Sequence, residues 1–319
     1  MSSYKRRPLI AVAGSLAFDR VMNFPGRFSA HIIPGKIHDL SLSFLLDQLI
    51  IGFGGTAGNI AYNLALLKER PSVLTAVGAD FAPYRRHLQS QGVDLRALAS
   101  DKKKNCASAF IITDADDNQI AGFYPGPSAL PSFSRLLNSA CDYVIISPDD
   151  KVRMLAVQVW ARKRKLPYIF DPGQQVTNFT SLELAAFIKD AFLVIGNDYE
   201  IEIIRRALKL KTAANICPTK ALIITKGAQG SEIVTGNKRV LIPAVLACES
   251  LDPTGAGDAY RAGLLKGLSL GLSLEDCARL AATVAVYAVE KKGTQNHHFT
   301  IKNLEKRYRQ SFGNAIKLT

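Results

Sequence analysis

The sequence predicts an α/β protein with a mostly parallel central sheet, helices on both faces of that sheet, and a small β lid. Short β-branched runs alternate with segments of helical periodicity over most of the 319 residues, which is typical of parallel sheets. Two stretches, at about 20–53 and 104–125, break this alternation and have the pattern of partly exposed strands. No polar linker or internal repeat divides the sequence, so we expect one domain over residues 1–319.

The first predicted strand is Leu9–Ala13, which ends at Gly14-Ser15. Basic residues before it imitate a signal peptide, but the apolar run stops at Asp19-Arg20 with no good cleavage site, so a buried strand explains it better. Later strands are predicted at 72–77, 143–146, 168–170, 192–195 and 222–225. Helices are predicted at 57–68, 83–91, 152–164, 182–188, 199–208, 256–270 and 274–289.

The lid is predicted from two inserts. In the first, residues 24–28, 32–35 and 37–46 alternate apolar and polar side chains between turn residues, which indicates short strands. In the second, residues 106–113 and 119–124 form a hairpin around an Asp- and Asn-rich turn. The two inserts could pair into one small sheet over an active site.

Composition argues against several classes of protein. Five scattered cysteines without Cys-x-x-Cys spacing do not fit a disulfide framework or a zinc site, and suit the cytoplasm. The histidines lack metal-ligand spacing, and the pair His297-His298 is expected on an exposed turn. No segment is long and apolar enough to span a membrane. The net charge of +13 raises nucleic acid as a partner, but the basic residues form short, separated clusters without aromatics, so we expect no specific nucleic acid.

The most informative stretch is Asp-Pro-Thr-Gly-Ala-Gly-Asp at 252–258, which runs directly into a helical segment. Its glycines let the backbone approach a ligand, and the first-turn N–H groups of a helix attract phosphate. Phosphate would repel the carboxylate of Asp258, so this side chain should have a chemical task. Accepting a proton from a hydroxyl that attacks phosphorus is such a task, and an acidic helix cap is the alternative.

This stretch resembles the C-terminal signature of the ribokinase-like (PfkB) family of sugar and nucleoside kinases. The resemblance implies a three-layer sandwich fold with a β lid. It also implies that Asp258 is the catalytic base, and that the amides of Gly255, Ala256 and Gly257 stabilise charge on the transferred phosphoryl group.

A second motif, Gly-Gly-Thr-Ala-Gly-Asn at 54–59, resembles the N-terminal signature of the same family. Gly54 and Gly55 leave room for a polyhydroxylated ligand, and Asn59 offers a donor and an acceptor to vicinal hydroxyls. Asp19 matches the family's early aspartate, which grips two ribose hydroxyls. The competing interpretation is a loose dinucleotide fingerprint of an NAD-dependent oxidoreductase, but it follows the wrong turn and lacks the usual acidic residue.

Two further motifs resemble the nucleotide and metal sites of the family. Asn-Asp-Tyr-Glu at 197–200 resembles its N-x-x-E motif, which implies that Glu200 acts on Mg²⁺ through water, although a helix cap is the alternative. The loop at 225–230 resembles the family's nucleotide loop, where a lysine could add charge or stand in a surface turn. The residues implied in ATP binding are Asn197, Thr225, Lys226, Gly227 and Gly230. Arg261, one turn into the catalytic helix, has no assigned role.

Segments over nearly the whole chain, at 24–29, 42–45, 123–126, 171–175 and 197–200, resemble bacterial adenosine kinases. That resemblance implies that Phe123 stacks on the base, whereas ordinary lid core is the alternative. The other nucleoside contacts that it implies are Ser15, Asp19, Ser43, Gln174 and Gln175. Ala109 and Phe110 depart from the pattern of that group. The group tends to have a base-stacking aromatic residue at this place, and the aromatic residue of this chain is one position out of register.

We therefore expect an ATP- and Mg²⁺-dependent kinase that phosphorylates the 5′-hydroxyl of a purine nucleoside, with adenosine as the first candidate. A ribose, fructose or broad-specificity nucleoside kinase is the alternative within the family. A non-catalytic nucleotide- or nucleic-acid-binding protein is the alternative from another class. Activation by K⁺ and a homodimer through the lid are left open by analogy with the family.

Overall fold

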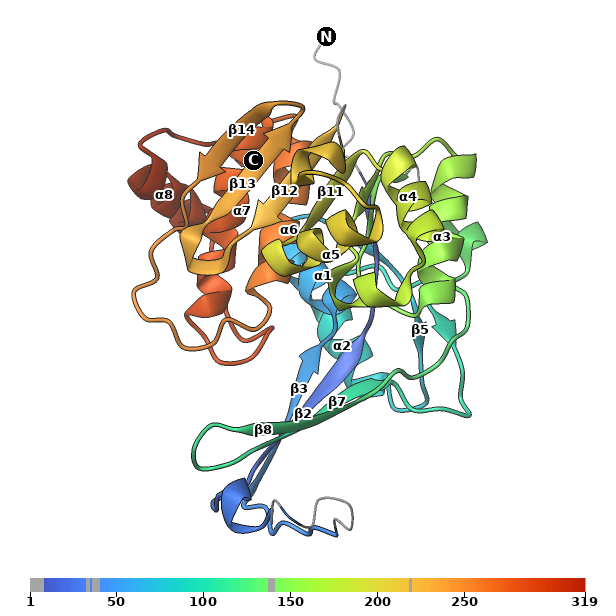
Figure 1. Ribbon diagram of the computed structural model, residues 1–319, viewed down its shortest axis with the longest axis vertical. Helices are drawn as coiled ribbons and strands as arrows, with labels where there is room; N and C mark the ends of the chain where they lie inside the picture. Colours follow the sequence, from blue (N-terminus) through green and yellow to red (C-terminus); the bar gives the residue numbers. More distant parts are fainter. Residues whose placement is uncertain (1–8, 33–34, 36–40, 137–140, 218–219, 319) are drawn as a thin grey trace.

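The computed structural model describes residues 9–32, 35, 41–136, 141–217 and 220–318. Its central strands are β1 Leu9–Ala13, β4 Ser72–Leu74, β9 Cys141–Ile146, β10 Tyr168–Phe170, β11 Leu193–Asn197, β12 Ala221–Thr225, β13 Ser231–Thr235 and β14 Lys238–Ile242. Within the described residues they form one eight-stranded sheet in the order β14-β13-β12-β11-β10-β9-β1-β4 (Figure 1). All neighbours pair in parallel except β13 and β14, which form an antiparallel edge beside β12.

Helices cover both faces of this sheet. One face carries α1 Thr56–Leu66, α2 Ala82–Ser90, α6 Ala256–Ser269, α7 Leu274–Val289 and α8 Ile301–Phe312, and the other carries α3 Lys151–Lys163, α4 Ser181–Asp190 and α5 Asp198–Ala207. Side chains of a strand alternate between the two faces, so Ile10 and Val12 pack into the first core whereas Ala11 and Ala13 pack into the second. This alternation produces the three-layer arrangement.

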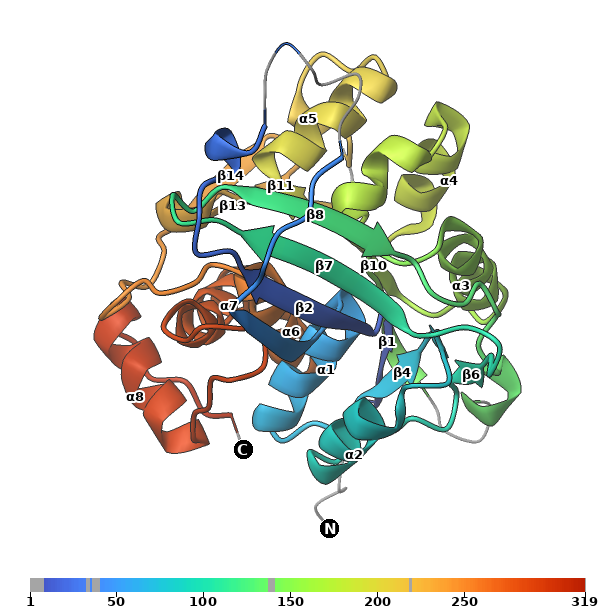
Figure 2. The same ribbon diagram turned by 90° about the horizontal axis from the view of Figure 1, so that it is seen from below.

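The lid is a second sheet, which projects from the body of the molecule (Figure 1). Its strands are β2 Ala17–Asn23, β3 Gln48–Gly54, β7 Ala107–Thr113 and β8 Gln119–Tyr124, in the order β3-β2-β7-β8. Figure 2 shows these strands side by side across the lower end of the molecule. β2 is antiparallel to β3 and parallel to β7, so the two inserts do join into one sheet.

The fold class is confirmed, and each helix expected from periodicity is present with shifts of a few residues at its ends. The hairpin β13–β14 and helix α8 were not predicted. The strand predicted at 72–77 is divided into β4 and β5 Ala76–Val77, and β5 pairs in parallel with β6 Ala99–Ser100, which was not predicted. Short 3-10 turns lie at Phe28–Ala30, Phe133–Leu136, Gly173–Asn178, Ala213–Asn215 and Gly227–Gln229.

The strands expected between residues 24 and 46 were wrong where the structure describes them. Phe24 and Phe28 stack on each other, with ring centroids 5.8 Å apart, and Phe44 lies 4.7 Å from Phe24. The apolar side chains of this insert therefore form an aromatic cluster around a 3-10 turn instead of one face of a strand. Residues 33–34 and 36–40, which belong to the same prediction, lie outside the described residues.

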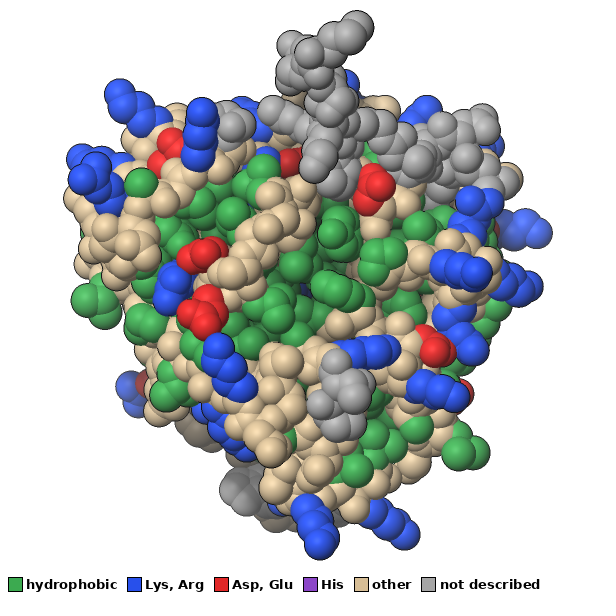
Figure 3. Space-filling model, turned by 90° about the horizontal axis from the view of Figure 1, so that it is seen from above, with side chains coloured by type: hydrophobic (Ala, Val, Ile, Leu, Met, Phe, Trp, Pro, Cys, Tyr) green, Lys and Arg blue, Asp and Glu red, His purple; other side chains and the backbone are tan. Residues whose placement is uncertain are grey.

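The end of the molecule opposite the lid is shown in Figure 3. Hydrophobic side chains gather near its centre, and Lys and Arg side chains are spread around its edge rather than joined into one patch. This distribution fits solvated helix faces as the source of the positive charge on this face. Within the described residues, no helix is both long enough and apolar enough to cross a membrane.

Candidate active site

A cavity of about 250 Å³ lies where the central parallel strands end, a common position for ligand sites in α/β proteins. Its wall combines residues that follow β9 and β10, residues at the ends of β11 and β12, and the first turns of α1 and α6. The lining residues are Thr56, Pro148, Asp171, Gly173, Gln174, Asn197, Glu200, Thr225, Gly255, Gly257, Asp258 and Arg261. Most of the motifs singled out from the sequence therefore meet at one place.

Asp258 lies in the first turn of α6 and faces this cavity. Gly255 caps the helix with φ at 81°, in the left-handed region where glycine is favoured, and α6 begins at Ala256. Oδ2 of Asp258 accepts a hydrogen bond of 2.8 Å from Nδ2 of Asn59 on α1. Burial raises the pKa of Asp258 to about 7, although the Arg261 guanidinium and the Asn59 bond oppose this shift. A carboxyl group with this pKa can accept a proton near neutral pH.

Arg261, to which the sequence assigned no role, lines the cavity one turn further along α6. It forms a bidentate ion pair with Asp171, which follows β10, and the Nη2–Oδ1 distance is 2.6 Å. Nη1 of Arg261 also donates to the carbonyl oxygen of Gly257 at 3.0 Å. Both side chains of the ion pair are buried, so Asp171 and Gly257 hold a cation beside Asp258.

Asp19 lies on β2 of the lid sheet, opposite Gly52 of β3. Burial raises its pKa to about 6, and the nearby Asp252 carboxylate contributes to this rise. Gly54 has no room for a side chain, because a Cβ atom at this position would lie 2.2 Å from Oδ2 of Asp19. The first glycine of the 54–59 motif therefore makes space for the aspartate itself.

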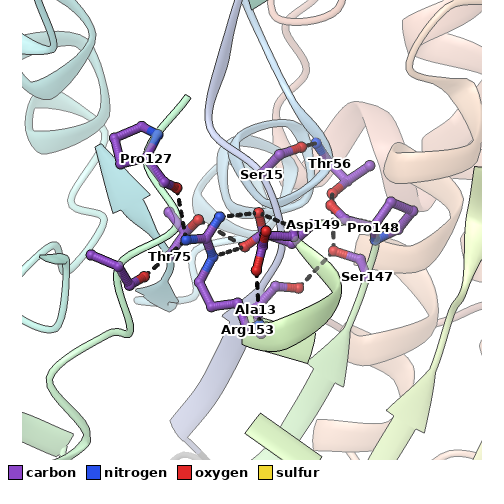
Figure 4. Close-up of polar contacts among 11 residues, drawn as sticks. Ala13, Ser15, Thr56, Thr75, Pro127, Ser147, Pro148, Asp149 and Arg153 are labelled. Atoms are coloured by element: carbon purple, nitrogen blue, oxygen red, sulfur yellow. Dashed lines mark hydrogen bonds and ion pairs between the residues drawn. The ribbon is translucent and has the colours of Figure 1, made fainter. Parts of the chain in front are cut away.

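Ser15 joins the end of β1 to the start of α1. Its Oγ accepts from the amide of Thr56 at 3.2 Å, and its carbonyl oxygen accepts from the amide of Ala57 at 3.0 Å. Thr56 is held in turn by Pro148, to whose carbonyl oxygen its Oγ1 donates at 2.9 Å (Figure 4). In this structure Ser15 orients the α1 terminus, whereas its predicted contact with a nucleoside stays a prediction.

Asn197 and Glu200 form a capping box at the start of α5. Oδ1 of Asn197 accepts from the amide of Glu200, and Oε2 of Glu200 accepts from the amide of Asn197, each at 2.8 Å. The helix cap given as the alternative is thus present in the structure, and Asn197 and Glu200 also line the cavity. Burial raises the pKa of Glu200, and the Asp171 carboxylate adds to this effect.

Whether the cavity can hold Mg²⁺ depends on the carboxylates that line it. Glu200 supplies a hard oxygen atom of the kind that Mg²⁺ prefers, whereas both carboxylate oxygens of Asp171 are paired with Arg261. Among the described residues, however, no group of three or more His, Cys, Asp or Glu side chains is arranged to hold a metal ion. The Glu200 carboxylate therefore fits a Mg²⁺ ion that takes most of its ligands from water and bound phosphates.

The loop after β12 differs from the predicted phosphate loop in one respect. Thr225 lines the cavity, but Nζ of Lys226 lies 2.6 Å from Oε2 of the buried Glu232. The lysine is therefore paired with a carboxylate of the following strand, β13. Gly227 and Gly230 adopt φ of 56° and 88°, and a side chain at Gly230 would collide with the carbonyl oxygen at position 242. These glycines have a structural role in the turn.

The remaining predicted nucleoside contacts are less closely gathered. Gln174 lines the cavity, whereas Gln175 accepts a hydrogen bond from Asn178 at 2.6 Å. Ser43 is exposed in the lid insert, and the Phe123 side chain on β8 is 58% exposed. The lid residues thus stand outside the cavity in this conformation of the chain.

A buried polar cluster beside Asn59 was not predicted. Gln295 is only 6% exposed, and its Nε2 donates to Oδ1 of Asn59 at 2.9 Å and to Oη of Tyr84 at 2.6 Å. Its Oε1 lies 3.0 Å from Nε2 of His87. Nothing in the sequence marks Gln295, which follows α7 in a segment without motif or periodicity.

The expected exposure of the His297-His298 pair was half wrong. His298 is exposed, but His297 is 1% exposed and its Nε2 lies 2.8 Å from Oδ1 of Asn63. Oη of Tyr62 donates to the His297 carbonyl oxygen at 2.7 Å. Burial lowers the pKa of His297 to about 4, so the ring is neutral at physiological pH. The segment that contains Gln295 and His297 packs along α1.

The fold and the site together define a class of protein. A carboxyl group with a pKa near neutrality, in the first turn of a glycine-capped helix that lines a cavity, suits phosphoryl transfer to a hydroxyl group. The protein is a phosphotransferase of this class. More specifically, the chain belongs to the pfkB family of carbohydrate kinases, whose family profile matches residues 28–300.

Several relatives of the chain carry more specific descriptions. A protein of Methanothermobacter thermautotrophicus described as a nucleoside kinase is 30% identical over 315 residues, which covers 96% of this chain and 97% of the relative. A nucleoside kinase of Methanocaldococcus jannaschii is 32% identical over 247 residues, or 77% of this chain and 82% of the relative. The structure of Burkholderia thailandensis nucleoside kinase in complex with inosine has a TM-score of 0.81 and 32% identity, and covers 96% of this chain and 99% of that chain.

Proposed function

We propose that this protein transfers the γ-phosphoryl group of ATP to the 5′-hydroxyl of a nucleoside. The observation that carries the proposal is the position of Asp258, which faces the cavity from the α6 terminus and is hydrogen-bonded to Asn59 of the other signature motif. The similarity to nucleoside kinases over nearly the whole chain supports a nucleoside as acceptor. The structure of the Burkholderia enzyme with ADP and inosine supports an adenine nucleotide as the second ligand.

In the proposed reaction, Asp19 and Asn59 bind the ribose hydroxyls and direct the 5′-hydroxyl toward Asp258. Asp258 accepts the proton as the hydroxyl oxygen attacks phosphorus, and the bond to the ADP oxygen breaks. The first-turn amides of α6, near Gly255 and Gly257, donate to the phosphoryl oxygens. Mg²⁺ held near Glu200 would neutralise negative charge on the phosphates. Because these groups act by position and charge, their preorganisation determines the rate.

Adenosine is the acceptor that the sequence favours, and inosine is the second candidate because a relative of similar length binds it. An aromatic surface for a purine is available from Phe123, which the lid would bring toward the cavity on closing. Ser43 and Gln174 are proposed to contact the nucleoside in that closed form.

The lid also exposes apolar side chains on β3, including Ile50 at 53% and Ile51 at 52%. Their exposure supports a homodimer that forms through the lid, and light scattering would measure the oligomeric state.

The decisive experiment measures ADP release from ATP and Mg²⁺ with adenosine, inosine, cytidine, ribose and fructose in parallel. We expect turnover with the purine nucleosides and at least about a hundredfold loss of kcat in Asp258→Asn, because that variant removes the base. Nucleoside binding should persist in the variant and is measured by calorimetry. Turnover with the sugars alone would overturn the nucleoside proposal, and substantial activity of Asp258→Asn would overturn the role of Asp258. Repeating the assay with K⁺ replaced by Na⁺ tests cation activation.

A further inference from the structure

Asn59 and Asp258 belong to helices α1 and α6, which pack against each other, and a third segment lies behind them. That segment, residues 293–297, is part of the connection between α7 and α8. Within it, the Oγ1 hydroxyl of Thr294 donates a hydrogen bond of 2.6 Å to the carbonyl oxygen of Phe53, which directly precedes the motif at 54–59. Thr294, Gln295 and His297 are all buried, although each carries a polar side chain. Burying polar groups is costly unless they are fully bonded, so this cluster calls for an explanation.

Gln295 is the member of the cluster that touches Asn59. Oη of Tyr84 donates to the carbonyl oxygen of Gly54 at 2.9 Å, so this hydroxyl must accept from the Nε2 group of Gln295. Oε1 of Gln295 then faces His87, whose Nε2 supplies the proton. These contacts determine which end of the Gln295 amide points to Asn59. It is the donor end.

The orientation of Asn59 follows from this. Its Oδ1 accepts from Gln295, and its Nδ2 therefore faces Oδ2 of Asp258 as a donor. Turning the Asn59 amide over would place an oxygen against the carboxylate and two NH₂ groups against each other. Both contacts would be repulsive in a buried setting.

We propose that Gln295 is a positioning residue that holds the Asn59 amide as a hydrogen-bond donor to Asp258 and thereby keeps the carboxylate oriented for proton transfer. This inference deepens the proposed function and rests on it for the identity of the acceptor. Gln295 touches neither the cavity nor the reacting atoms. It acts through Asn59.

Loss of the donor also changes the charge balance around Asp258. Arg261 on α6 favours the ionised carboxylate, whereas the carboxylates of Asp171 and Asp19 disfavour it. The Asn59 hydrogen bond lowers the pKa of Asp258 against the effect of burial. Without Gln295 to orient that bond, the pKa of Asp258 should rise, so the ionised base is present only at higher pH. His87 and Tyr84, which face Gln295 from α2, are neutral near pH 7.

The test uses three single variants of the full chain. Gln295→Met keeps the side-chain length and removes the amide, and Gln295→Glu keeps the shape but has no donor when ionised. Asn296→Asp adds the same negative charge at the next position, which is exposed, and is the matched control. For each variant we would measure kcat, KM, the pH dependence of kcat, thermal unfolding, and the carboxyl ¹³C titration of Asp258, assigned with Asp258→Asn.

We expect Gln295→Met to lower kcat by about tenfold and to change the nucleoside KM by less than about twofold, the size of effect of one charge-assisted hydrogen bond. The Asp258 titration and the acidic limb of kcat should both move to higher pH. Gln295→Glu should lose more activity, because its carboxylate attracts the Asn59 NH₂ group away from Asp258. Asn296→Asp should match the wild type.

A double-variant cycle separates positioning from stability. If Gln295 acts through Asn59, Gln295→Met should have little further effect on kcat in an Asn59→Ala background. Equal effects in both backgrounds, or wild-type kcat with an unchanged Asp258 titration in Gln295→Met, would overturn the proposal. If the wild type phosphorylates no nucleoside or sugar, the proposed function fails, and the Asp258 titration in Gln295→Met still decides the positioning role.

Discussion

In the role of general base proposed for it, Asp258 must meet two conflicting requirements with one side chain. A general base must be ionised at the working pH, yet burial disfavours the charged form and raises the pKa to about 7. The guanidinium of Arg261 and the amide of Asn59 both favour the ionised form, which keeps the pKa near neutrality instead of higher. The environment of Asp258 thus matches its basicity to neutral pH.

The pKa values of Asp258 and Asp19 predict how kcat/KM depends on pH. Below about pH 7, Asp258 is protonated in the free enzyme and cannot accept the proton of the attacking hydroxyl. Below about pH 6, Asp19 is protonated as well and would bind the ribose hydroxyls in the proposed reaction less well. We therefore expect log kcat/KM to fall with a slope of about one below pH 7 and more steeply below pH 6. Initial rates from pH 5 to 9 at saturating Mg²⁺ measure this profile, and a flat response below pH 7 would contradict it.

At the scale of single elements, the proposed ribose site depends on how closely the lid strands β2 and β3 approach each other. β2 carries Asp19, and β3 ends in Gly52-Phe53-Gly54, which pairs with β2. The two glycines look equivalent in the sequence. In the structure, a Cβ atom at Gly54 would lie 2.2 Å from the Asp19 carboxylate, whereas a Cβ atom at Gly52 would come no nearer than 3.7 Å to Asp19.

Gly54→Ala should therefore displace the Asp19 carboxylate, whereas Gly52→Ala should not. We expect the nucleoside KM to rise about tenfold or more in Gly54→Ala, as when hydrogen bonds to a charged group are lost, and the ATP KM to stay within about twofold. Gly52→Ala is the matched control and should have wild-type constants. Steady-state kinetics with each substrate varied in turn compares the two variants, and equal effects of both would refute the steric role of Gly54.

The sequence was a good guide to elements that have a periodic pattern or a motif. α6 was predictable because a glycine-rich turn precedes a long apolar-periodic segment, and β7–β8 because two alternating runs flank a polar turn. α8 was missed because it is mostly polar and buries only Leu304 and Tyr308. The insert at 24–46 was misjudged because its aromatic residues satisfy each other in a cluster, which no period reveals.

The site was only partly predictable for a related reason. Motif residues such as Asp258 and Glu200 do line one cavity. The residues that orient them come from distant segments, as Asp171 does for Arg261 and Gln295 does for Asn59. These contacts exist only after folding, and no local pattern in the chain specifies them. The pairing of Lys226 with Glu232 was hidden in the same way.

For the whole molecule, one buried ion pair links the lid to the central sheet. Arg153 on α3 is 2% exposed and binds both carboxylate oxygens of Asp149, each at 2.6 Å (Figure 4). Its Nη1 also donates to the carbonyl oxygens of Pro127 at 3.0 Å and Ala129 at 2.8 Å, where the chain returns from β8. Thr75 completes the shell around Asp149 with a bond of 2.9 Å.

Removing this cation should destabilise the whole protein. Arg153→Met leaves Asp149 buried without a counter-charge, and the expected loss is about 3–5 kcal/mol of the free energy of unfolding. The matched control is Arg206→Met, which breaks an ion pair with Glu202 at the same i,i+4 spacing but has a 74% exposed side chain. That change should cost less than about 1 kcal/mol. Urea unfolding of the two variants compares them, and similar losses would contradict the importance of burial.

The pairing of β2 with β7 has a consequence for how the molecule is made. Ala17 lies opposite Ala107, so the lid cannot close its sheet until the chain between these strands has been synthesised and brought into place. Contacts between such distant segments form slowly, because the entropy of closing the loop is lost before the contacts are gained. Asp19 and Asp258 are also far apart in the sequence. In a nascent chain, the strand that carries Asp19 is therefore made well before the helix that carries Asp258, and the proposed site can be assembled only after both have been synthesised.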